Sequence, residues 1–88
     1  MTRVRSLNFL NLQNNCLVGN LPDEIGDWES LVELYLANNE ITGTLPASIG
    51  KMKRLKILDV FGNRMSGVLP PELCELVQLN YLNLRNNK

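Results

Sequence analysis

Residues 31–54 read LVELYLANNEITGTLPASIGKMKR, and the 24 residues before them and the 24 after them repeat the same pattern. Residues 7–30, 31–54 and 55–78 align without gaps, and residues 79–88 begin a fourth copy. The aliphatic columns are Leu7, Leu31, Leu55 and Leu79; Leu10, Leu34, Leu58 and Leu82; and Leu12, Leu36, Val60 and Leu84. A fixed period of about 20 to 50 residues is typical of a solenoid in which each repeat forms one turn. We therefore expect a single domain over residues 1–88, with a lead-in at 1–6.

The first half of each repeat predicts a short β-strand. The spacing of Leu34 and Leu36 matches the period-two alternation of a strand with one buried face. We expect strands at 9–13, 33–37, 57–61 and 81–85. Because each strand follows its predecessor after a complete turn of chain, the strands must run parallel, with right-handed crossovers.

The second half of each repeat holds turn-forming residues. Its columns are Leu17, Ile41 and Met65; Gly19, Gly43 and Gly67; and Leu-Pro pairs at 21–22, 45–46 and 69–70. Glycine suits a bend or a close backbone approach, and proline removes a ladder donor. The segments after proline, 23–26 and 47–50 among them, are too short for a regular helix, so we expect one 3₁₀ or α turn in each.

An asparagine follows every predicted strand. The members of this column are Asn15, Asn39, Asn63 and Asn87. An inward-facing amide without hydrogen bonds would cost a few kcal/mol. We therefore expect a structural ladder in which each side-chain amide bonds backbone groups of its own and neighbouring repeats.

Composition argues for a binding protein rather than an enzyme. The chain has nine basic and nine acidic residues and no histidine, which excludes His-dependent triads and imidazole bases. Acidic residues such as Asp23 and Asp27 are expected on short turns that face water, and the glycines are not clustered in a phosphate-binding loop. We expect no catalytic residue, cofactor or metal ion, no nucleic-acid partner and no direct membrane contact.

The two cysteines are not expected to bond each other. Cys16 and Cys74 lie in different columns more than two repeats apart. Turns that stack at about 4.8 Å would place their Cα atoms beyond the roughly 7 Å limit for a disulfide. Cys16 is expected at the surface, whereas Cys74 takes the position of Gly26 and Gly50 and is expected to be a small buried residue.

The repeat resembles the plant-type leucine-rich repeat, usually written LxxLxxLxLxxNxLxGxIPxxLGx. The leucine, Asn, Gly and Pro columns match it in all three full repeats, over nearly the whole chain. Leucine replaces isoleucine before each proline, and Cys74 replaces the second glycine of one repeat. The resemblance implies a curved right-handed solenoid of the α/β class, with a parallel sheet on the concave face. It also implies a second short strand near each Gly-Pro segment and short 3₁₀ or α turns on the convex face.

The same resemblance implies a recognition function. Proteins with this repeat are similar in forming binding surfaces, as in ectodomains of plant receptor-like kinases and receptor-like proteins, and in inhibitors of secreted hydrolases. We therefore expect a protein or peptide partner on the concave face, and a location at the extracellular face of the plasma membrane or in secreted form. A cytoplasmic scaffold or adaptor stays an alternative, since the sequence has no Asn-x-Ser/Thr glycosylation acceptor.

Outward positions of the predicted concave face hold the candidate contacts. Four of the five aromatic residues fall there, and aromatic and arginine side chains dominate binding hot spots. We expect partner contacts from Glu33, Tyr35, Ile57, Asp59, Phe61, Tyr81, Asn83 and Arg85. Aromatic and β-branched residues are also favoured on sheets for packing alone, so each of these residues has a structural alternative.

Neither end of the repeat array shows a terminal repeat with a polar outer face. Solenoids need such capping repeats to stay soluble. We therefore expect the array to continue into further repeats or caps, or to cover its ends by association.

Overall fold

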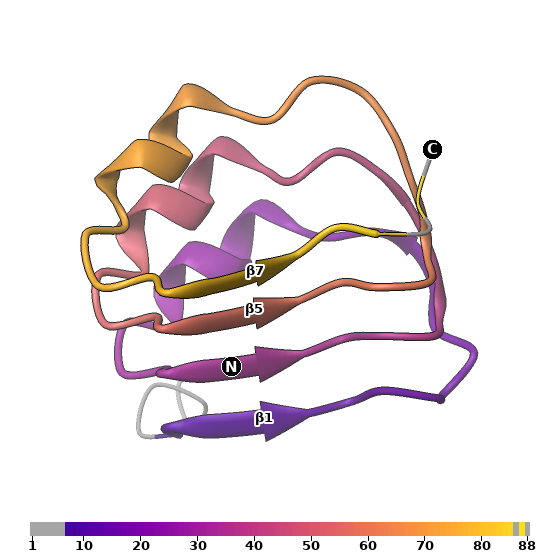
Figure 1. The fold of residues 1–88 in the computed structure, drawn as a ribbon, viewed down its shortest axis with the longest axis horizontal. Helices are drawn as coiled ribbons and strands as arrows, with labels where there is room; N and C mark the ends of the chain where they lie inside the picture. The colour runs from indigo at the N-terminus through magenta and orange to yellow at the C-terminus, as the bar shows by residue number, and fades with distance from the viewer. Residues whose placement is uncertain (1–6, 86, 88) are drawn as a thin grey trace.

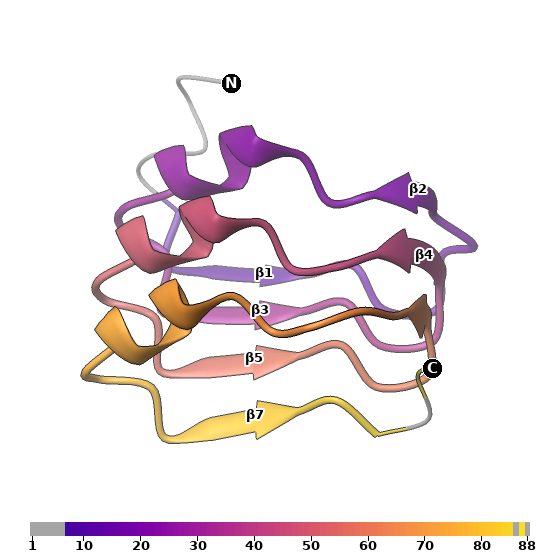
Figure 2. The same cartoon turned by 90° about the horizontal axis from the view of Figure 1, so that it is seen from above.

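Two parallel sheets and a row of short helical turns wind into a coil in the computed structural model, which describes residues 7–85 and 87 (Figures 1 and 2). The larger sheet has the order β1-β3-β5-β7, with bounds Phe9–Asn11, Glu33–Tyr35, Ile57–Asp59 and Tyr81–Asn83. The smaller sheet has the order β2-β4-β6, with bounds Val18–Asn20, Glu40–Gly43 and Arg64–Met65. The 3₁₀ turns η2, η3 and η4 span Asp23–Asp27, Ala47–Lys51 and Pro71–Glu75. The predicted fold class is confirmed, while the predicted lead-in at 1–6 lies outside the described residues.

The strands of the larger sheet begin where the sequence predicted but end two residues earlier. Strand β3 ends at Tyr35 rather than at position 37, and the other three strands are shortened in the same way. Asn14, Asn38 and Gly62, just beyond the predicted ends, adopt positive φ angles of 63°, 59° and 72°. This left-handed conformation turns the chain out of the strand direction, so the strand geometry stops before it.

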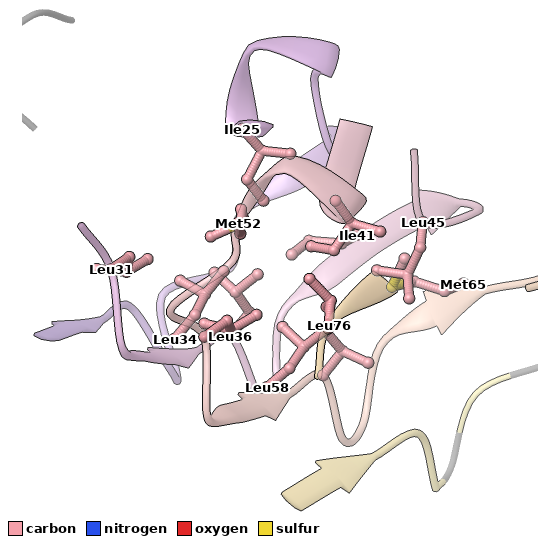
Figure 3. Close-up of a cluster of buried hydrophobic side chains, with 13 residues drawn as sticks. Ile25, Leu31, Leu34, Leu36, Ile41, Leu45, Met52, Leu58, Met65 and Leu76 are labelled. Carbon is pink, nitrogen blue, oxygen red and sulfur yellow. The ribbon is translucent and has the colours of Figure 1, made fainter. Parts of the chain in front are cut away.

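The core fills the space between the two sheets and the helical turns. Leu34 and Leu58 of the larger sheet are completely buried, as are Ile49 of η3 and Met52 just after it. In Figure 3 the side chains from the strands and from the turns meet in this interior. Each fully buried side chain of this size contributes about 1.5 to 3 kcal/mol relative to an exposed one. The inward columns therefore hold the repeats together.

The asparagine amides join each repeat to the one before it. Nδ2 of Asn39 donates to the carbonyl oxygens of Leu36 at 2.9 Å and Leu12 at 3.0 Å, which belong to two successive repeats. Its Oδ1 accepts hydrogen bonds from the backbone N–H groups of Asn15 at 3.0 Å and Leu17 at 2.9 Å. One side chain thus satisfies donors and acceptors in both repeats.

The same bonding recurs one repeat later. Asn63 donates to the carbonyl oxygens of Val60 and Leu36, at 3.0 and 2.9 Å, and accepts from the N–H of Ile41 at 3.1 Å. Asn15 differs, because its Nδ2 bonds only carbonyl oxygens of its own repeat among the described residues. Asn15 is exposed, whereas Asn39 and Asn63 are buried.

Equivalent columns become exposed toward the ends of the array. Ile41 is 3% exposed and Met65 is 5% exposed, but Leu17 in the same column of the first repeat is 37% exposed. Leu12 is likewise only partly buried, whereas Leu36 and Val60 in the same column are buried. The described residues supply no preceding repeat to cover these side chains.

Cys74 is exposed, so the prediction that it is a buried residue is wrong. A Cβ placed on Gly26 would lie 2.7 Å from the carbonyl oxygen of Ser48, and one on Gly50 would lie 3.0 Å from that of Glu72. This column therefore faces the next helical turn. Cys74 lies on η4, the last turn among the described residues, and no further turn covers it there. Cys16 is exposed, as predicted, and both thiols are free.

Replacing Asn39 by alanine should lower the free energy of unfolding by about 3 kcal/mol, because it leaves several buried backbone groups of two repeats without partners. Asn15→Ala is the matched control and should cost about 1 kcal/mol or less, since its bonds are confined to one repeat and exposed. Urea unfolding of both variants measures the difference. Equal losses would show that the bonds between repeats do not carry the stability assigned to them.

Candidate binding surface

The face of the larger sheet that points away from the core carries most of the predicted contacts. We call this surface the open sheet face and define it by the outward residues of its strands. These residues are Phe9, Asn11, Glu33, Tyr35, Ile57, Asp59, Tyr81 and Asn83. Strand pairing sets Glu33, Ile57 and Tyr81 side by side in one row. It sets Tyr35, Asp59 and Asn83 side by side in the next row.

Six of the eight predicted contact residues therefore lie together in two adjacent rows of the open sheet face. The other two, Phe61 and Arg85, follow strands β5 and β7 and lie beyond the strand ends. Phe61 is half-buried and Arg85 is exposed. That these residues contact a partner stays a prediction.

Tyr35 is held in place by two contacts on this face. Its hydroxyl donates a hydrogen bond to Oε1 of Glu33 at 2.7 Å. Its ring packs against Phe9, with 5.5 Å between the ring centroids and 50° between the ring planes. The hydrogen bond to Glu33, followed by partial desolvation of the hydroxyl and by the negative charges of Glu33 and Asp59, raises the pKa of the Tyr35 phenol above its ordinary value. The Tyr35 ring is thus fixed in position, and its hydroxyl keeps its proton next to two negatively charged carboxylates.

Three residues of one column make the same backbone contact after their strands. Asn11, Asp59 and Asn83 each accept a hydrogen bond at 3.1 Å from the N–H two residues ahead. The amide of Asn83 also donates to the Tyr81 hydroxyl at 3.2 Å. Such local bonds limit the rotamers of these side chains, so the open sheet face is ordered before any partner binds.

Phe9 belongs to the open sheet face although it was not among the predicted contacts. It pairs with Glu33 in the sheet register and is 54% exposed. Its column was visible in the sequence, because Phe9 occupies the same repeat position as Glu33. The tilted contact between the rings of Phe9 and Tyr35 depends on side-chain rotamers, which the repeat pattern does not specify.

The described part of the chain contains neither a candidate metal site nor a candidate membrane-spanning helix. Residues 7–85 and 87 contain no group of three or more His, Cys, Asp or Glu side chains that could hold a metal ion. Over the same residues, no helix is long and apolar enough to span a membrane.

Replacing Glu33 by glutamine should lower the pKa of Tyr35 toward its ordinary value, because the carboxylate is both the hydrogen-bond acceptor and the nearest negative charge. Since folding raises this pKa, the associated stabilisation is present below about pH 10 and is lost as the pH rises through the folded-state pKa. A Tyr81→Phe background leaves Tyr35 as the one titrating phenol, which ultraviolet absorbance follows. Glu40→Gln, on β4, is the control and should leave the titration unchanged. A Tyr35 pKa that does not move in Glu33→Gln would contradict the electrostatic effect assigned to the Glu33 carboxylate.

Comparison with known proteins supports the repeat assignment. Residues 29–88 match a family model described as Leucine rich repeat, and residues 6–28 match a second model with the same description. No curated protein sequence matches the chain.

Solved structures similar to this chain include several receptor ectodomains. The plant peptide hormone receptor RGFR1, in complex with RGF2, is 39% identical with a TM-score of 0.93, and the match covers 96% of this chain and 14% of the receptor. The PEPR1 structure with AtPEP1 is 37% identical with a TM-score of 0.92, covering 96% of this chain and 12% of that one. The receptor kinase ectodomain GASSHO1/SCHENGEN3 from Arabidopsis thaliana, in complex with CASPARIAN STRIP INTEGRITY FACTOR 2, is 30% identical with a TM-score of 0.89. That match covers 92% of this chain and 10% of the ectodomain. With its repeat pattern, its fold and the family match all in agreement, the chain belongs to the leucine-rich repeat family.

Proposed function

We propose that this chain is a protein- or peptide-recognition segment of a leucine-rich-repeat array, and that its ligand binds the open sheet face. One observation carries the proposal. The polar side chains in two rows of the open sheet face are held by hydrogen bonds, next to aromatic rings, on a face that no described segment covers. On this proposal the segment is a binding module rather than an enzyme, and residues 1–88 act as one domain of repeats.

The composition of this face suits a binding surface. Phe9 and Tyr81 are 54% and 47% exposed, and Tyr35 lies between their strands. Rigid aromatic side chains lose little conformational entropy on binding and supply much of the energy at interface hot spots. The hydrogen bonds that fix Tyr35 and Asn83 reduce the entropy lost on binding further.

The similar structures support the same class of partner. RGFR1 is described as a peptide hormone receptor in complex with RGF2. GASSHO1/SCHENGEN3 is described as a plant membrane receptor kinase in complex with CASPARIAN STRIP INTEGRITY FACTOR 2. Because the chain spans only 14% and 10% of these proteins, we carry over a protein or peptide ligand and an extracellular location as proposals only.

We also propose that further repeats or caps cover both ends of the array. Leu17 is exposed where its column mates are buried, and Leu69 is 44% exposed where Leu45 is only 3% exposed. A pocket lined by Met65, Leu69 and Leu84, among others, opens at the C-terminal end. Apolar surfaces of this kind match the faces that successive repeats bury against each other in the interior.

A double substitution, Tyr35→Ala with Phe61→Ala, should weaken peptide binding about tenfold or more, because it removes one aromatic anchor of the open sheet face and a second one just beyond the end of β5. Each change should cost about 1 kcal/mol or less in stability, since both side chains lie outside the core. The probe is a nonapeptide selected by the 88-residue chain from a displayed random library. Isothermal titration calorimetry measures its affinity, and urea unfolding measures stability.

Asp27→Ala with Arg54→Ala provides the control, because both residues are exposed and lie on or near the helical turns. This variant should bind the selected peptide as the wild type does. Binding that survives the aromatic substitutions, or that falls equally in the control, would place the peptide elsewhere and contradict the proposal.

A further inference from the structure

Two carboxylates lie diagonally across neighbouring strands of the open sheet face. Glu33 is on β3 and Asp59 is on the neighbouring strand β5, offset from Glu33 by two residues in the strand register. Both act on the Tyr35 phenol, which lies beside Asp59 in the sheet and bonds Glu33. The centre of this face is therefore negatively charged.

No salt bridge within the described residues includes either carboxylate. The salt bridges there join Lys53 to Glu75 at 3.2 Å and Arg64 to Glu40 at 3.9 Å. Neither pair includes Glu33 or Asp59. One oxygen of each carboxylate is engaged, by the Tyr35 hydroxyl and by the N–H of Phe61, and the second oxygen of each accepts no hydrogen bond from a described residue. Each therefore keeps an oxygen free for an incoming donor.

The fold does not require a negative charge at either position. In the column of Asp59, the neutral side chains of Asn11 and Asn83 accept the same hydrogen bond at the same distance, 3.1 Å. Glutamine at position 33 could likewise accept the hydrogen bond from the Tyr35 hydroxyl. Both charges are thus surplus to the local structure.

Aromatic rings flank the carboxylates. Phe9 packs against Tyr35 in a tilted arrangement with 5.5 Å between ring centroids, and Tyr81 lies in the same row as Glu33, two strands away. Ring faces attract ammonium and guanidinium groups, and they also pack against the methylene stems of lysine and arginine. The carboxylates can pair with the charged group of a lysine or arginine, and the rings can pack against its methylene stem.

We infer that the peptide bound by the open sheet face carries an arginine or lysine side chain, which pairs with Glu33 and Asp59 and packs against Tyr35 and Phe9. This inference rests on the proposed function and specifies the chemistry of its ligand. The charge complementarity selects a basic peptide over a neutral or acidic one, since a like charge at this place would be repelled.

The test uses nonapeptides selected from the displayed random library by the 88-residue chain. The selected sequences should be enriched in arginine or lysine. Replacing the basic residue of the best binder by citrulline or norleucine should weaken binding about tenfold, from the loss of two ion pairs and one cation–π contact. Glu33→Gln with Asp59→Asn should cause a similar loss and remove the preference for the basic residue.

Glu40→Gln with Glu75→Gln is the matched control, because it also removes two negative charges, on β4 and η4, away from the open sheet face. It should leave binding unchanged, and urea unfolding should show all variants folded. NMR shift mapping of the amides of Tyr35 and Asp59 locates the bound peptide.

The outcomes separate the two proposals. Peptides that map to the open sheet face but carry no basic residue, or that bind the Glu33→Gln, Asp59→Asn variant equally well, would overturn the inference and leave the proposed function standing. Failure to select any peptide, or shifts confined to another surface, would overturn both.

Discussion

Backbone N–H and C=O groups must find hydrogen-bond partners at the turn that follows each strand, and the fold is built around this requirement. The amide of Asn39 meets this need because one side chain carries both a donor and an acceptor, and it bonds backbone groups of two successive repeats. Aspartate could not donate these bonds, and leucine could make none of them. An insertion of one residue would move the amide away from its partners in the preceding repeat. The constant period of the chain follows from this geometry.

Because the inward columns fix the backbone, the outward positions are free to vary. Leu34 and Leu58 are alike and completely buried, whereas their neighbours Glu33 and Ile57 occupy one outward column with different chemistry. The sheet register still sets these outward side chains side by side at constant spacing. A regular scaffold therefore presents an irregular surface, which is what a selective binding site needs.

Most of the fold and part of the candidate site could be predicted from the sequence. Periodic signals such as the leucine and asparagine columns predicted the parallel strands and the 3₁₀ turns, because each signal is repeated in register. The predicted strand ends were wrong, since the positive φ angles at positions 14, 38 and 62 are backbone conformations that the leucine and asparagine columns do not specify. The prediction that Cys74 is buried was also wrong, because the exposure of Cys74 depends on what packs beyond the last helical turn. The rows of the open sheet face were predictable, but the bond between Tyr35 and Glu33 depends on rotamers that no pattern encodes.

Repetition also provides an internal control for separating structural from functional residues. Glu40 and Arg64 occupy the same repeat position with opposite charges, and Nη2 of Arg64 lies 3.9 Å from Oε1 of Glu40. The difference between these two residues therefore has a structural explanation, because they form an ion pair between repeats. Asp59 has none, because Asn11 and Asn83 make the same turn contact without a charge. Tyr35 departs further, since it replaces the turn contact by a partly buried hydrogen bond to Glu33. In a repeat protein, a residue that differs from its column while the fold gains nothing from the difference is the natural place to look for function. This criterion supports our proposal that the ligand binds at the centre of the open sheet face.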